Sequence, residues 1–311
     1  MRRRTERGDP ECAIAHASEV IGDWWSLLLL RDVARGRHRF EELRAGLGVS
    51  RKVLTERLHR LVEDGVLERH PYSDRPPRHE YRLTARGRGA LPILVALQDW
   101  GDRWLLGDGE PTATAGADTA EARRVRALVG TRIPDLVGFD PVAATPFTVL
   151  YCYPGTSMPG GAEIPGAAGC TLESCTYRDR LDEFARLGAA VRGVSTQRPA
   201  EQAAFAAAER IQFPLLSDVE LELASALRLP TFRTGGTVRL KRLTLVVDAG
   251  RTVRAVHYPI PDVTGGVAET LRLVRTLAGS PAAGATTPVA DGAGDRADIP
   301  DVPSPTSAGT D

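Results

Sequence analysis

The chain of 311 residues is poor in cysteine and carries no net charge, and each of these features excludes a class of protein. Four cysteines are too few for a scaffold held together by disulfides. A formal net charge of zero argues against a uniformly basic protein. No apolar run is long enough to cross a membrane, and the charged opening MRRRTERGDPE is not a signal peptide. We therefore expect a cytoplasmic protein without a membrane partner, in which paired thiols are more often reactive than structural.

The length and the local composition predict two domains, a connecting segment and a tail. Residues 1–107 show helical periodicity and hold 20 Lys and Arg against 16 Asp and Glu. Residues 108–128 begin with DGEPTATAGADTA, which predicts a flexible linker. Residues 129–279 alternate apolar runs with helical patterns. Residues 280–311 contain no aromatic residue and few large apolar ones, so we expect this tail to be disordered.

The first domain has the order of elements that is typical of a winged helix-turn-helix, an α+β fold. Ser50 is a predicted helix N-cap and Gly65 a predicted terminator. The pattern predicts helices over 11–22, 23–36, 39–48, 49–65 and 89–105, and strands at 66–72 and 79–84.

The polar face of the helix at 49–65 and the turn of the hairpin carry side chains that suit DNA. Arg and Lys near the start of such a helix can bind guanine in the major groove, and Thr can contact a base or a phosphate. The alternative is a solvated charged face, but the basic hairpin turn that follows favours DNA. The candidate DNA-binding residues are Arg51, Lys52, Thr55, His59, Arg75 and Arg78.

Residues 12 to about 106 resemble the HxlR family of bacterial transcriptional regulators. The resemblance rests on Cys12, on the Trp-centred second helix, and on VLTERL, PPRHEYRLT and LPILVALQDWG. It implies a homodimer, formed through the helices near 12–22 and 89–106, that binds an inverted repeat in a double-stranded DNA operator. In some members the cysteine at the position of Cys12 senses oxidants or electrophiles. The alternative is that Cys12 only packs in a helix contact.

The second domain reads as an open α/β sheet with helices on its faces, in the manner of thioredoxin. Apolar runs at 147–154 and 189–195 predict buried strands, and 243–259 predicts a strand, a turn and a strand. Helical patterns lie between them at 170–188, 199–211 and 221–229.

Two cysteines lie five residues apart on the predicted helix at 170–188. Cys170 begins this helix, where the helix dipole is expected to lower the pKa of its thiol. Cys175 lies about 7.5 Å farther along the axis, beyond the Cα separation of about 4.4–6.8 Å that a disulfide accepts. A disulfide between them therefore requires the first turn to unwind. A zinc site needs more ligands than these two cysteines and His257, the only histidine in this half of the chain. We therefore expect no metal and no cofactor. Two inert buried thiols are the alternative, and Cys152 on its apolar strand is best interpreted that way.

Residues from about 130 to 277 resemble peroxiredoxins, especially those with both cysteines on one helix. GCTLESCTYRD, RIPDL, FPLLSD, LRLPTF and KRLTLVVDAG carry the resemblance. It implies that Cys170 is the peroxidatic cysteine, Cys175 the resolving cysteine, and Arg242 the residue that holds thiolate and peroxide. The partners would be a peroxide and an unknown thiol reductant.

The sequence departs from the peroxiredoxin pattern three residues before Cys170, where the family usually has Thr or Ser. Ala167 occupies that position, and the nearby hydroxyls that could substitute belong to Thr156, Ser157 and Thr171.

Three functions follow from these two resemblances. The first is a DNA-binding regulator whose second domain senses or disposes of peroxide. The second is a thiol peroxidase that is tethered to a DNA-binding domain. The third is a regulator whose second domain is redox-inactive and serves dimerisation or ligand binding. Retention of the two cysteines and the arginine favours the first two over the third, and Ala167 favours the first over the second.

Overall fold

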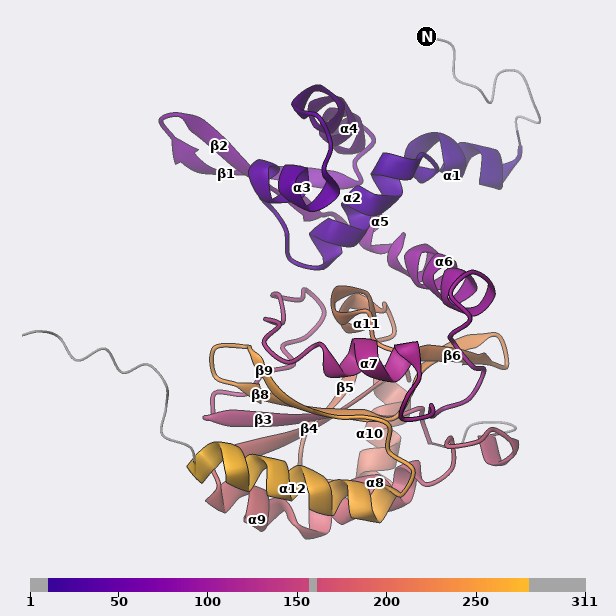
Figure 1. Ribbon diagram of the computed structural model, residues 1–311, viewed down its shortest axis with the longest axis vertical. Helices are drawn as coiled ribbons and strands as arrows, with labels where there is room; N and C mark the ends of the chain where they lie inside the picture. Colours follow the sequence, from indigo (N-terminus) through magenta and orange to yellow (C-terminus); the bar gives the residue numbers. More distant parts are fainter. Residues whose placement is uncertain (1–10, 157–160, 280–311) are drawn as a thin grey trace, which may run out of the picture. The chain divides into compact units, whose positions relative to one another are not determined.

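The computed structural model describes residues 11–156 and 161–279 (Figure 1). The tail that we expect to be disordered, 280–311, and Ser157 lie outside these residues. Within the described part of the chain, no helix is both long and apolar enough to span a bilayer.

The first domain confirms the predicted winged helix-turn-helix. Its helices and strands are α1 (Ala13–Ile21), α2 (Trp24–Ala34), α3 (Phe40–Leu47), α4 (Arg51–Glu63), β1 (Leu67–Asp74), β2 (Pro77–Leu83), α5 (Ala85–Arg88) and α6 (Leu91–Trp104). β1 and β2 pair antiparallel and form the wing. Asp23 caps α2 by accepting from the amides of Trp25 and Ser26, and Ser50 caps α4 by accepting from the amide of Val53. The apolar side of α4 packs into the core of this domain.

The second domain is built on a mixed sheet with the strand order β5-β4-β3-β8-β9. β3, β4 and β5 run parallel, and β8 and β9 pair antiparallel beside β3. The strands are β3 (Phe147–Cys152), β4 (Ala189–Ser195), β5 (Leu215–Ser217), β8 (Leu243–Asp248) and β9 (Val253–His257), and a separate hairpin is formed by β6 (Thr231–Thr234) and β7 (Thr237–Leu240). This arrangement is the predicted thioredoxin-like fold.

Helices cover both faces of the sheet and enclose one apolar core on each. The helices of this domain are α8 (Cys170–Asp179), α9 (Leu181–Arg186), α10 (Pro199–Ala208), α11 (Glu222–Leu227) and α12 (Val263–Gly279), with a 3-10 turn, η2 (Gly161–Glu163). Side chains of α8, α9 and α12 pack together on one face, and α11 lies on the other (Figure 1). The prediction of one helix over 170–188 is wrong, because the backbone leaves helical geometry at Arg180 (φ −112°, ψ 11°) and a second helix begins at Leu181.

The segment that we expect to be a flexible linker, 108–128, contains a helix of its own, α7 (Ala120–Arg126). Thr119 caps α7, and Ala122 and Val125 are buried in the same core as α11. Ala113, nearer the first domain, is also fully buried. In the structure this connection is therefore packed against the second domain and is not a flexible linker.

Candidate functional site

Cys170 is the first residue of α8 and lies almost completely buried. Gly169 precedes it with a φ of +92°, a left-handed conformation that glycine adopts without strain. The residue is 4% exposed. Its sulfur lies 3.5 Å from the carbonyl oxygen of Ala167 and 3.5 Å from the Nη2 of Arg242. The fold thus brings together two residues that are 72 positions apart in the sequence and that the peroxiredoxin resemblance pairs.

Arg242 joins the loop before α8 to an acidic residue on that helix. Its Nη2 donates to the carbonyl oxygen of Ala168 at 2.9 Å, and its Nη1 pairs with the carboxylate of Glu173. The arginine and the glutamate are both buried, at 1% and 2% side-chain exposure. Sequence reasoning missed Glu173, because an acidic residue inside a helix looks like one of the many that face solvent.

Burial controls the proton affinity of the site. It raises the pKa of the Cys170 thiol, the nearby Arg242 guanidinium works against this rise, and the Glu173 carboxylate adds to it. The expectation of a lowered Cys170 pKa is therefore wrong for this structure, because the helix start lies inside the core and not at the surface. Burial also raises the pKa of Glu173 to about 7, although Arg242 opposes the change.

Cys175 lies on the same continuous helix and is only partly buried. Its thiol lies 3.6 Å from Oε2 of Glu209, and burial is the largest cause of its raised pKa. Neither this cysteine nor Cys170 forms a disulfide in the structure. Cys152 lies fully buried in β3, where the loss of solvation raises its pKa.

Of the hydroxyl groups considered as replacements at the position of Ala167, those of Thr156 and Thr171 belong to described residues, and neither hydrogen-bonds the sulfur of Cys170. The amide of Thr156 donates to Oε1 of Gln197 at 3.0 Å, and its hydroxyl lies within 3.5 Å of the same side chain. Thr171 is exposed. Among residues 11–156 and 161–279, no side-chain hydroxyl hydrogen-bonds the sulfur of Cys170.

The candidate DNA-binding side chains on α4 lie on one exposed face, but two of them have acidic partners. Arg51 pairs with Glu41 at 2.6 Å, and Nδ1 of His59 lies 3.2 Å from Glu63. Thr55 donates to the carbonyl oxygen of Arg51 at 2.9 Å. The remaining three candidates, Lys52 on α4 and Arg75 and Arg78 in the wing, are exposed and make no ion pair with any described residue.

The outer side of α6 carries an exposed apolar stripe. Ile93, Leu97, Trp100 and Trp104 recur at the spacing of one helical face and are 44–65% exposed. Ile14 of α1, in the other helix that the resemblance assigns to dimerisation, is 79% exposed. We call the four side chains on α6 the α6 stripe.

Cys12 lies immediately before α1, at the N-cap position of that helix. It is partly exposed, and its side chain makes no capping hydrogen bond. It is a free thiol.

Comparisons with known proteins assign the two halves separately. Residues 20–108 match the family described as HxlR-like helix-turn-helix, and residues 146–256 match the AhpC/TSA family. An uncharacterized HTH-type transcriptional regulator of Mycobacterium tuberculosis is 45% identical over 93 residues, which are 30% of this chain and 59% of that protein. The chain thus spans less than two thirds of the length of this relative.

The second half has relatives and a structural neighbour of its own. A candidate peroxiredoxin of M. tuberculosis is 36% identical over 131 residues, which are 41% of this chain and 79% of that protein. The crystal structure of the peroxidoxin BcpB from M. tuberculosis is 30% identical and covers 43% of this chain and 81% of its own, with a TM-score of 0.37.

Proposed function

The chain belongs to the HxlR-like helix-turn-helix family through residues 20–108 and to the AhpC/TSA family through residues 146–256, and from this premise we propose that it is a DNA-binding transcriptional regulator that responds to peroxide through Cys170 and Cys175. The observation that carries the proposal is the contact of 3.5 Å between Nη2 of Arg242 and the sulfur of Cys170. A guanidinium at this distance stabilises the thiolate, which is the nucleophilic form.

The proposed chemistry has two balanced steps. The Cys170 thiolate attacks one oxygen of a peroxide, the O–O bond breaks, and the other oxygen leaves as an alcohol or water after taking up a proton. The sulfenic acid on Cys170 then condenses with the thiol of Cys175, which forms the disulfide and releases water. A dithiol or two monothiols acting as reductant restore both thiols.

Two features of the site support a sensor over a fast peroxidase. Burial raises the pKa of Cys170, so only a small fraction of the thiol is ionised near neutral pH. Ala167 supplies no hydroxyl to hold the peroxide. A thiol that reacts slowly and only once per signal tolerates both, whereas rapid turnover does not. The burial of Cys170 also favours the remaining alternative, a redox-inactive second domain, because a thiol that is rarely ionised reacts little with peroxide.

The proposed partner of the first domain is an operator with an inverted repeat, bound by a homodimer. The exposed face of α4, with Lys52, and the wing, with Arg75 and Arg78, would supply the cations that meet DNA. The α6 stripe would supply the dimer contact, because so many exposed apolar side chains on one helix face usually mark an interface. Two recognition helices in such a dimer would read half-sites about 34–36 Å apart.

One titration tests the proposal. Operator DNA is titrated with the full chain, first reduced and then treated with one equivalent of peroxide, and the thiols are mapped by mass spectrometry. We expect a Cys170–Cys175 disulfide together with an affinity change of about 5- to 150-fold, the usual range of allosteric coupling. Cys175→Ser should leave a trappable sulfenic acid on Cys170. Unchanged affinity despite a complete disulfide would leave the second domain as an appended peroxidase, and a Cys170 that stays reduced in folded protein would remove the thiol chemistry.

A further inference from the structure

The segment between the two domains contacts both the loop before Cys170 and Arg242. Ala113 is fully buried, and its amide donates to the carbonyl oxygen of Pro165 at 2.9 Å. Its carbonyl oxygen accepts from the backbone amide of Arg242 at 3.1 Å. One residue of the connection therefore bonds both the loop that leads into Cys170 and the residue that faces its sulfur.

The contact between this segment and the loop is close. A side-chain carbon added to Gly166 would come within 2.8 Å of the Cβ of Thr114. Ala113 also packs with Ala167 and Phe232 in a small apolar cluster. The loop can therefore hardly change its path without displacing residues 113 and 114.

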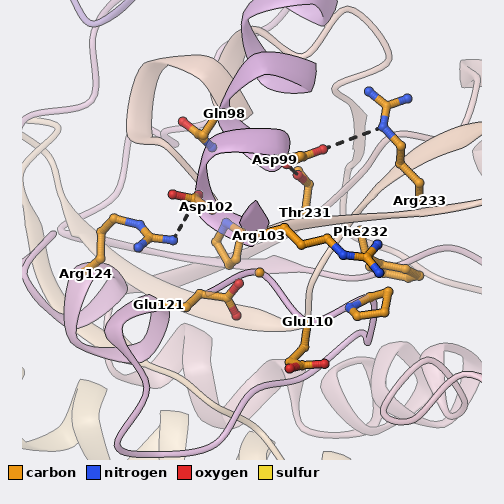
Figure 2. Close-up of a pocket in the computed structure, with 13 residues that line it drawn as sticks. Gln98, Asp99, Asp102, Arg103, Glu110, Glu121, Arg124, Thr231, Phe232 and Arg233 are labelled. Carbon is orange, nitrogen blue, oxygen red and sulfur yellow. Dashed lines mark hydrogen bonds and ion pairs between the residues drawn. The ribbon is translucent and has the colours of Figure 1, made fainter. Parts of the chain in front are cut away.

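The other end of the segment is tied to the C-terminal end of α6. The amide of Asp108 donates to the carbonyl oxygen of Asp102 at 2.8 Å. The carboxylates of both residues bind Arg124 of α7, at 2.9 Å for Asp108 and 3.3 Å for Asp102. Figure 2 shows Asp102 and Arg124 facing each other beside the pocket that α6, residues 109–111 and β6 line.

A buried ion pair completes the connection from α7 back to Arg242. Glu121 of α7 accepts from Nζ of Lys241 at 2.9 and 3.0 Å, and both side chains are buried. Lys241 directly precedes Arg242 in the chain. The connection thus binds Arg242 through Ala113 and the preceding residue, Lys241, through Glu121.

We propose that residues 111–114 are a positioning segment of the thiol site, which holds Arg242 and the loop 164–168 around Cys170, and that they carry the disulfide state of Cys170 to the end of α6. This inference rests on the thiol chemistry proposed above. Disulfide formation must unwind the first turn of α8, because Cys170 and Cys175 are about 7.5 Å apart along the helix axis. The loop that moves with Cys170 is bonded to Ala113, so the hydrogen bonds of Ala113 break or shift in the same step.

The coupling reaches the surface that the dimer would use. Asp102 lies on α6 between Trp100 and Trp104 of the α6 stripe, and its carboxylate is also held by Arg228 at 2.6 Å. Release of residues 108–114 would loosen one side of that anchorage and so change how α6 is held. Because coupling is reciprocal, binding that favours one arrangement of α6 would shift the equilibrium between the Cys170–Cys175 dithiol and its disulfide by the same factor.

Hydrogen exchange of the full chain tests the inference. Exchange is followed by mass spectrometry in the reduced protein, in the protein oxidised with one equivalent of peroxide, and in Cys175→Ser treated in the same way. That variant can form a sulfenic acid but no disulfide with residue 175. We expect peptides that cover 102–115 and 164–168 to exchange at least about fivefold faster in the oxidised wild type, the lower end of ordinary coupling. Peptides of β3 and β4 should not change, and the peroxide-treated variant should match the reduced protein.

The outcomes separate this inference from the proposed function. A complete Cys170–Cys175 disulfide with unchanged exchange over 102–115 would overturn the positioning segment and leave the thiol chemistry standing. Equal acceleration in Cys175→Ser would also overturn it, since unwinding would then not be the cause. If no disulfide forms in folded protein, the inference falls together with the chemistry on which it rests.

Discussion

Arg242 and Glu173 form an ion pair in which both side chains are buried, at 1% and 2% exposure. Removing one partner of such a pair leaves an uncompensated buried charge and costs about 3–5 kcal/mol, whereas replacing both is far less costly. We expect Arg242→Met to lower the free energy of unfolding by about that amount at pH 8, where the Glu173 carboxyl is mostly ionised. Arg242→Met combined with Glu173→Gln should regain most of the loss.

Urea denaturation of the full chain measures this prediction. Arg186→Met is the matched control, because Arg186 is exposed and makes no ion pair with any described residue. Its unfolding free energy should stay within about 0.5 kcal/mol of the wild type. If Arg242→Met and the control shift the transition equally, the ion pair does not stabilise the fold.

Glu173 predicts a pH dependence of stability. Burial raises its pKa from 4.5 to about 7, so the folded chain keeps this proton between about pH 4.5 and pH 7 while the unfolded chain has lost it. The contribution of Glu173 to the free energy of unfolding is therefore most favourable below pH 4.5. This contribution declines as the pH rises to 7 and then levels off. A pKa difference of one corresponds to about 1.4 kcal/mol, and we expect this contribution to fall by about 2–3 kcal/mol across the window.

The measurement is the free energy of unfolding at pH 5, 6, 7 and 8 for the wild type and for Glu173→Gln. Asp218, whose pKa is also raised to about 7 by burial, titrates in the same window in both proteins. The difference between the two curves isolates Glu173 for that reason. Parallel curves would show that residue 173 does not titrate in this range.

The cations that we propose to contact DNA predict two kinds of effect on operator binding. Arg75→Ala and Arg78→Ala should weaken binding to all sequences and reduce the slope of affinity against salt, because each would remove a proposed contact with a phosphate. Lys52→Ala should weaken binding more than Arg51→Ala, because Arg51 already pairs with Glu41. Binding is measured at several salt concentrations, with Arg186→Ala as the control. An operator affinity that survives the combined change of Arg51 and Lys52 to Ala would mean that α4 is not the recognition helix.

Local signals in the sequence predicted the elements well where local chemistry decides the structure. Ser50 and Asp23 cap helices because their side chains replace missing backbone partners, and that depends only on near neighbours. The apolar run at 189–195 is observed as β4 over the same residues. The glycine pair at 235 and 236 is a turn signal, and it forms the connection between β6 and β7. The helix α12 was missed, although Val267, Leu271 and Val274 have helical spacing.

The features of the site that the sequence did not predict depend on contacts between distant residues. Helix position alone predicts a lowered pKa for Cys170, but burial under side chains from other elements reverses the direction. Glu173 acquires its role only because Arg242, 69 residues away, reaches it. The composition of 108–120 predicts a flexible linker, yet Ala113 finds partners at positions 165 and 242 that no local pattern could reveal.

The α6 stripe predicts a dimer that one charge can disrupt. Leu97 is 48% exposed in the middle of the stripe. Leu97→Glu should turn the dimer into a monomer and reduce operator affinity, because a charge buried between two apolar faces is left without a partner. Size-exclusion chromatography with light scattering gives the mass. Val219→Glu, at a similarly exposed apolar side chain of 41%, should leave it unchanged. A wild-type monomer at micromolar concentration would contradict the assignment of the stripe.

The last prediction decides which cysteine senses the oxidant. Operator affinity is measured before and after peroxide for the wild type, Cys170→Ser and Cys12→Ser. Cys170 faces Arg242, whereas Cys12 lies partly exposed at the start of α1, one of the two helices that the HxlR resemblance assigns to dimerisation. If the peroxide signal passes through the second domain, Cys170→Ser should lose the response and Cys12→Ser should keep it. The reverse pattern would make Cys12 the sensor, since its oxidation could shift the dimer contact directly. Equal affinity of the reduced and oxidised wild type would exclude both routes and favour a redox-inactive second domain.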